Sequence, residues 1–104
     1  MENINKIDLN NVTFRLMAEE KFCVKGRGTY IAGRISLGKI SSGEEVIISD
    51  KTGTTKGRTK VIVEFFCSSK MKDKDTAYEN MNIALMLKDT TVNEVDVNDY
   101  LIML

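Results

Sequence analysis

Four basic side chains between residues 51 and 60 form the one run of the sequence with a local excess of positive charge. They are Lys51, Lys56, Arg58 and Lys60. Lysine and arginine bind phosphate oxygens and neutralise their charge, so the run is a candidate for contact with a phosphate backbone. A solvated loop without a partner would have the same composition. Both interpretations stay open at this point.

A second candidate is the acidic pair Glu19 and Glu20, which the aromatic residue Phe22 follows closely. Carboxylate oxygens can accept hydrogen bonds from ribose hydroxyls, and an aromatic ring can stack on a base. Adjacent carboxylates at a break between strands are also commonly solvated, and an aromatic residue in an alternating strand commonly belongs to the core. Neighbouring residues of a strand point to opposite faces, which does not suit hydrolysis by paired carboxylates.

The residue types that most enzymes and metal sites need are missing. The chain has no histidine and only two cysteines, Cys23 and Cys67, far apart in the sequence. The usual general base and the commonest metal ligand are therefore absent. No Gly-x-x-x-x-Gly-Lys-Ser/Thr loop is present to hold nucleotide phosphates. We expect no enzymatic activity, no metal or other cofactor, and no bound nucleotide.

Length and composition indicate one small globular domain. The chain has 104 residues, of which 42% are hydrophobic, and 15 basic residues balance 15 acidic ones. Proteins that bind nucleic acid mainly through phosphate neutralisation are usually basic overall, so any contact with RNA should be local. No apolar run is long enough to cross a bilayer, and two unpaired cysteines suit a reducing compartment. These features predict a cytoplasmic protein without a membrane partner.

The hydrophobic pattern from residue 13 onward is that of β-strands. Apolar residues alternate or form short β-branched blocks, and glycines interrupt them about every ten residues. The expected strands cover residues 13–18, 22–24, 29–35, 39–40, 46–48, 60–67, 82–88 and 100–103. Residues 50–59 are expected to form a mobile hairpin loop and residues 70–75 a charged connection. Residues 1–12 contain few apolar side chains and are expected to be loosely ordered.

These strands predict an all-β fold, a small closed or nearly closed antiparallel β-barrel over residues 13–104. Closure removes the exposed strand edges of an open sheet. The expected interior consists of the side chains that alternate onto one face, namely Phe14, Leu16, Val24, Ile31, Ile35, Val46, Ile48, Val61, Val63, Leu85 and Leu87.

Residues 22–35, with Gly26-Arg27-Gly28 and Gly33-Arg34, resemble the second domain of elongation factor Tu-type translation GTPases. Residues 38–40, 43–46, 77–88 and 95–102 are similar to later segments of that domain, so the resemblance extends from residue 13 to the end. Asn82 and Asn98 stand where the family usually has glycine, and asparagine tolerates the left-handed backbone region better than most residues.

The resemblance implies a β-barrel of the translation-factor domain 2 type, standing alone without a GTPase domain. It also implies that Glu19, Glu20 and Phe22 face the terminal adenosine and the aminoacyl group of tRNA. Asn80 matches an asparagine of the amino-acid pocket, and Arg27 matches the arginine of the glycine-flanked turn. We therefore expect a non-enzymatic binding module that contacts tRNA, ribosomal RNA or a translation-associated protein. The alternative is a protein-interaction or regulatory β-barrel without a role in RNA binding, whose face docks a separate chain or another copy.

Overall fold

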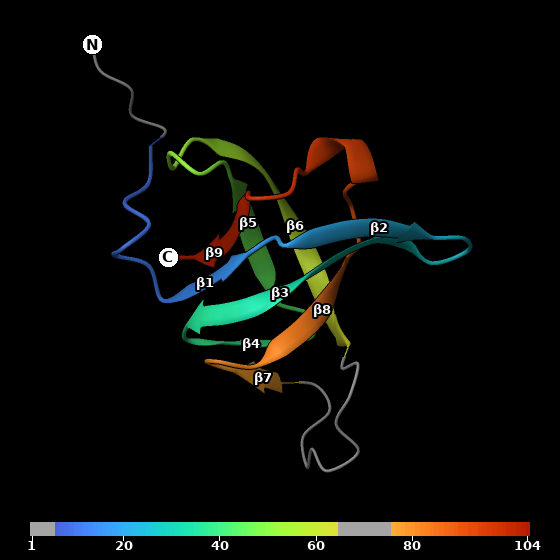
Figure 1. The fold of residues 1–104 in the computed structure, drawn as a ribbon, viewed down its shortest axis with the longest axis horizontal. Coiled ribbons are helices and arrows are strands. Elements are labelled where there is room, and N and C mark those ends of the chain that lie inside the picture. Colours follow the sequence, from blue (N-terminus) through green and yellow to red (C-terminus); the bar gives the residue numbers. More distant parts are fainter. Residues whose placement is uncertain (1–5, 65–75) are drawn as a thin grey trace.

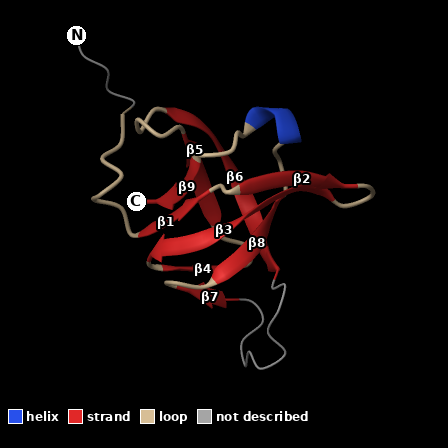
Figure 2. Ribbon diagram, viewed as in Figure 1, coloured by secondary structure: helices blue, strands red, loops and turns tan. Residues whose placement is uncertain are grey.

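The computed structural model describes residues 6–64 and 76–104, which form nine strands and one short 3-10 helix (Figures 1 and 2). The strands are β1 (Phe14–Met17), β2 (Glu20–Val24), β3 (Gly28–Leu37), β4 (Lys39–Ser41), β5 (Glu45–Ser49), β6 (Thr55–Glu64), β7 (Thr76–Tyr78), β8 (Asn82–Leu87) and β9 (Tyr100–Met103), and the helix is η1 (Val92–Glu94). The end of the strand predicted over 60–67, the connection at 70–75 and residues 1–5 lie outside the described residues.

Six antiparallel strands close into a barrel in the order β1-β9-β5-β6-β8-β3, and β3 pairs back with β1. The predicted all-β antiparallel barrel is thereby confirmed. β2 continues from β1 past a bend and pairs with the first half of β3, so the β2–β3 hairpin extends beyond the barrel (Figure 1). β4 and β7 form a separate two-stranded ribbon. Within the described ranges, no helix reaches the length and hydropathy needed to cross a bilayer.

The barrel interior holds the predicted side chains, with one exception. All of the expected interior residues are buried except Val24, which is half-buried. Val24 lies two residues after Phe22 on the outer side of β2, so the inner face predicted for this strand is wrong. The core also contains Ile40 and Ala77 from the small ribbon.

A second, smaller cluster lies on the outside of the barrel. Val12 packs there against Ile47 of β5 and Ile102 of β9, together with the partly buried Ile7 and Leu9. The backbone amide of Ile7 donates to the carbonyl of Gly53 over 2.8 Å. The sequence pattern assigned these residues to no core, because isolated apolar residues in a polar stretch carry no periodicity.

The predicted mobile loop over residues 50–59 is wrong in its second half. β6 begins at Thr55, and its first residues pair with β5 in the register Ile47↔Arg58 and Ile48↔Gly57. The inward positions of this part of β6 are Gly57 and Thr59 instead of large apolar side chains, so it shows no hydrophobic alternation. The backbone hydrogen bonds to β5 nevertheless hold this part of β6 in the sheet.

Two asparagines adopt the left-handed conformation. Asn98 does so with a φ of 79°, as the sequence predicts, but the prediction for Asn82 is wrong. Asn82 is the first residue of β8 and pairs with Arg34, whereas Asn80 takes the positive φ, 75°, in the turn before the strand. The turn from Tyr78 to Met81 closes two residues earlier than the pattern indicates.

Candidate functional site

Glu20, Phe22 and Arg27 lie together on the outer surface of the β2–β3 hairpin and the strands beside it. Strand register places Phe22 beside Tyr30, Tyr30 beside Met86, and Met86 beside Ile62. This apolar row crosses β2, β3, β8 and β6 on the side away from the core; Tyr30 is buried, and the other three side chains are half-buried. The neighbouring row consists of Glu20, Ala32, Ala84 and Glu64. We call these two rows the aromatic face.

The aromatic rings and Arg27 are tied to one another on this face. The rings of Phe22 and Tyr30 stack with centroids 5.4 Å apart and an interplanar angle of 7°. The Arg27 guanidinium lies 5.9 Å from the centroid of the Tyr30 ring and donates to Glu64 Oε2 over 2.8 Å. Phe22 therefore belongs neither to the core nor to an open ring surface, and Arg27 already has an anionic partner.

Glu19 and Asn80 lie elsewhere, in an open hollow of about 390 Å³ outside β1 and β3. We call it the arginine hollow. Its lining consists of Arg15, Met17, Glu19, Arg34, Ile35, Ser36, Asn80 and Tyr100. The structure thus separates the adjacent carboxylates, because successive strand residues point to opposite sides and the bend between β1 and β2 falls at this position. Of the candidate residues carried over by resemblance, the hollow brings together two.

Several polar groups of the arginine hollow are not engaged with the rest of the protein. Arg15 is engaged, since its Nε donates to Ser36 Oγ over 2.9 Å and its NH1 to the carbonyl of Leu9 over 2.7 Å. By contrast, within residues 6–64 and 76–104 the side chains of Glu19, Arg34, Asn80 and Tyr100 have no hydrogen-bond or ion-pair partner. One hollow therefore offers a cation, a carboxylate, an amide and a phenol to a ligand.

The basic residues of β6 lie in a line on its outer side, at every second position. Lys56 Nζ donates to Asp99 Oδ2 over 2.6 Å and to Asp96 Oδ2 over 3.0 Å. The hydrogen bond to Asp99 is the largest of the effects that raise the pKa of Lys56 above its ordinary value. Arg58 lies 3.6 Å from Glu45, and Lys60 stands opposite Glu45 in the strand register. Lys56 and Arg58 therefore have acidic partners, whereas Lys60 forms no ion pair among the described residues.

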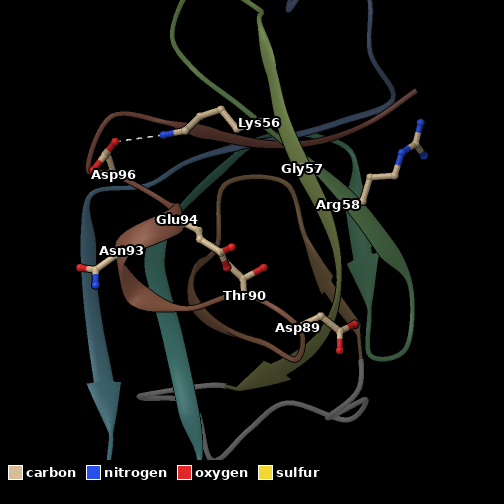
Figure 3. Close-up of a pocket in the computed structure, with 8 residues that line it drawn as sticks. All are labelled: Lys56, Gly57, Arg58, Asp89, Thr90, Asn93, Glu94 and Asp96. Carbon is tan, nitrogen blue, oxygen red and sulfur yellow. Dashed lines mark hydrogen bonds and ion pairs between the residues drawn. The ribbon is translucent and has the colours of Figure 1, made fainter.

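Figure 3 shows the hollow beside these residues, of about 400 Å³, which contains more carboxylates than cations. Lys56 extends toward Asp96, and Arg58 points away from both, to the right in this view. The hydrogen bond from Lys56 lowers the pKa of Asp96. A carboxylate-rich hollow whose lysine is already paired repels a phosphate. Within the fold, Lys56 is therefore engaged with Asp96 and Asp99.

Lys51 lies apart from the β6 row, in the turn that follows β5. The neighbouring Asp50 carboxylate accepts hydrogen bonds from the Thr52 hydroxyl over 2.7 Å, the Thr52 amide over 2.9 Å and the Thr54 amide over 3.0 Å. The Thr52 hydroxyl contributes most to lowering the pKa of Asp50. These local hydrogen bonds stabilise the turn, and Lys51 is exposed beside it.

Arg34, Tyr100 and Asp99 were not identified as candidate residues from the sequence. The alternation around Ile31 and Ile35 points Arg34 outward, but only the strand pairing brings it near Asn80 and Tyr100. Among the described residues no group of three or more His, Cys, Asp or Glu could hold a metal ion. A scan against models of known protein families finds none that matches this chain.

Proposed function

We propose that the chain is a non-enzymatic binding module whose arginine hollow holds the 3′-terminal nucleotide of an RNA, such as tRNA with or without its aminoacyl group. The observation that supports the proposal most is the set of four unengaged polar side chains around one hollow. Stability does not explain the set, because none of the four has a partner among the described residues.

Each of the four groups matches a part of a terminal nucleotide. A guanidinium such as that of Arg34 binds a phosphate through two parallel hydrogen bonds. The Glu19 carboxylate can accept hydrogen bonds from both hydroxyls of a terminal ribose, while the Asn80 amide can donate to a base or to an aminoacyl carbonyl. Tyr100 offers a ring and a hydroxyl at the wall of the hollow, and 390 Å³ is enough for one such unit.

The charge of the chain limits the affinity for RNA that we expect. The chain has no net charge, and one arginine of the hollow is already bonded to the protein. With a single phosphate contact, the logarithm of the binding constant should fall with the logarithm of salt concentration with a slope of about −0.7, the value per phosphate for single strands. A steeper slope would require further phosphate contacts outside the hollow.

The test is an NMR titration of the labelled protein with a hairpin RNA that ends in a single-stranded 3′ segment. We expect shifts at Glu19, Arg34, Asn80 and Tyr100, and an affinity reduced about tenfold by Arg34→Ala through loss of a charged hydrogen bond. Glu19→Gln should weaken the binding of an RNA with a free terminal diol. It should not weaken the binding of the same RNA with a 3′-phosphate. Lys51→Ala, a change of equal charge outside the hollow, is the matched control.

Asn80 needs a special variant because it has two roles. Asn80→Gly keeps the positive φ of the turn and removes only the amide, whereas Asn80→Ala would strain the turn as well. We expect Asn80→Gly to weaken the binding of the aminoacylated RNA more than that of the free RNA. The stability of the protein should not change. Absence of shifts in the hollow at about millimolar RNA would contradict the proposal, and so would shifts confined to the β6 row.

A further inference from the structure

Residues 6–11 run along the outside of the barrel before β1 begins, on the side where β9 ends (Figure 1). The amide of Ile7 donates to the carbonyl of Gly53 over 2.8 Å. Ile7 and Leu9 also pack against the small outer cluster, to which Tyr100 of the arginine hollow belongs. We call residues 6–11 the N-terminal strap, and it lies against one side of the hollow.

The N-terminal strap supplies oxygen atoms that hold the Arg15 guanidinium. NH1 of Arg15 donates to the carbonyl of Leu9 over 2.7 Å and to Asn10 Oδ1 over 3.3 Å. Both acceptors are neutral, and among the described residues no carboxylate pairs with this arginine. A phosphate oxygen would accept a stronger, charge-assisted hydrogen bond from the same group. The strap therefore occupies the position that an anionic ligand of Arg15 would take.

The barrel itself holds Arg15 at the hollow independently of the strap. Arg15 Nε donates to Ser36 Oγ over 2.9 Å, and the Ser36 hydroxyl donates to the backbone carbonyl of Arg15 over 3.1 Å. Arg15 belongs to β1 and Ser36 to β3, and both line the hollow together with Arg34. Release of the strap would therefore free NH1 while Nε stays bound to the barrel.

The strap is held more weakly than the chain that follows it. Ile7 and Leu9 are half-buried, and the other residues of the strap are exposed. Val12 is buried, and the amide of Thr13 donates to the carbonyl of Met103 over 2.8 Å, so the chain is fixed from Val12 onward. A segment with few buried apolar contacts opens at a lower free energy than the whole domain. The strap can thus open while β1 stays in the barrel.

We propose that the strap regulates the arginine hollow by competing with a second phosphate for Arg15, an inference that rests on the proposed binding of an RNA 3′ end. While the strap is closed, a phosphate of the RNA meets Arg34, and Arg15 is held by the strap. Once the strap is open, the next phosphate of the same strand can bind Arg15. The open state therefore binds the RNA more tightly, and RNA binding and strap closure oppose each other.

Opening the strap by substitution is the first test. Ile7→Ser with Leu9→Ser removes both apolar anchors without a change in charge. We expect this double variant to bind the hairpin RNA about tenfold more tightly than the wild type, with a salt slope of about −1.4 because a second phosphate is bound. Arg15→Ala in the same background should remove the gain, and a gain that survives it would overturn the proposal. Ile62→Ser, the same kind of change at a half-buried residue of the aromatic face, is the matched control.

A disulfide that keeps the strap closed tests the proposal in the opposite direction. Lys6 and Thr54 form an antiparallel bridge, in which Cα atoms lie about 4.5 to 5.5 Å apart, within the range of a disulfide. In a Cys23→Ser, Cys67→Ser background, oxidised glutathione should join Lys6→Cys to Thr54→Cys. The oxidised form should bind the RNA with a salt slope of about −0.7, and Arg15→Ala should not weaken it further. If it binds as tightly as the opened variant, the strap does not control the hollow.

Inorganic pyrophosphate separates a failure of this proposal from a failure of the proposed function. Titrated into the Ile7→Ser, Leu9→Ser variant, it should shift the Nε–H resonance of Arg15, whereas in the oxidised disulfide variant it should not. Such shifts without any binding of RNA would support the strap and contradict the proposed function. RNA binding at Arg34 without a pyrophosphate shift at Arg15 would contradict the strap and leave the proposed function standing.

Discussion

The ion pair between Lys56 and Asp99 should contribute strongly to stability, and its removal has a signature that can be worked out from the structure. The Asp99 side chain is 7% exposed and accepts hydrogen bonds from Lys56 over 2.6 Å and from the Asp96 amide over 2.8 Å. Lys56→Met leaves this buried carboxylate without its cation. Breaking a buried pair costs about 3 to 5 kcal/mol, and we take about 3 because the Lys56 side chain is 28% exposed.

The two other variants of a double-mutant cycle should cost less. Asp99→Asn keeps an oxygen for the Asp96 amide and frees Lys56 to bind Asp96 or water, so we expect a loss of about 1.5 kcal/mol. The double variant removes the unpaired charge as well and should lose only about 2 kcal/mol, less than Lys56→Met alone. Urea unfolding gives these free energies. For a chain of this size the Lys56→Met variant should melt about 15 °C below the wild type.

The pH dependence of stability provides a second signature of Lys56, through its hydrogen bond to Asp96 as well as its own titration. The pKa of Asp96 is lowered from its ordinary 3.8, so its contribution is present above that pH and is lost as the pH falls toward the folded-state value. The pKa of Lys56 is raised from 10.5, so its contribution is lost only as the pH rises above that. Lys56→Met should make the free energy of unfolding depend less on pH in both the acidic and the alkaline range. Equal stability of Lys56→Met and wild type, or strict additivity in the cycle, would refute the reasoning.

Further predictions concern backbone packing and turns. Gly33→Ala should cost about 3 kcal/mol in urea unfolding because its Cβ would lie 2.2 Å from a backbone oxygen of β1, while Gly57→Ala, with open space, should stay within about 0.5 kcal/mol. Lys21→Met should lose about 1 kcal/mol, since Lys21 Nζ donates to two carbonyls around η1 over 3.1 and 3.0 Å. Because the pKa of Asp50 is lowered, the protection of the amides in its turn, measured against their intrinsic exchange rates at the same pH, should fall only below about pH 4.

The fold was predictable from the sequence wherever the inner side of a strand is apolar. Ile31 and Ile35 of β3 are separated by small or polar residues, and Leu85 and Leu87 of β8 share one face of an apolar run; both patterns revealed the strand and its inner face. The start of β6 was not predictable, because Gly57 occupies an inward position and backbone pairing alone fixes the strand. The ribbon strand β7 is three residues long, too short for any period to show.

The candidate site was less predictable because its residues meet through long-range pairing. Glu19 and Asn80 could be named from resemblance, but no local pattern indicates that they share a hollow with Arg34 and Tyr100. The partners of Lys56 lie 40 and 43 residues later in the chain. In the sequence, Lys56 therefore looks available to a ligand, although acidic residues neutralise it in the fold.

Charged groups in this protein divide into those that hold the fold and those that do not. Lys56, Asp96 and Asp99 join β6 to the segment before β9, and their loss should unfold the chain more easily. Arg34 and Glu19 have no partner among the described residues, so substituting them should change stability by less than about 0.5 kcal/mol. An Arg34→Ala variant that melts like the wild type but binds RNA more weakly would therefore have lost a contact with the ligand, because altered folding would lower the melting temperature as well.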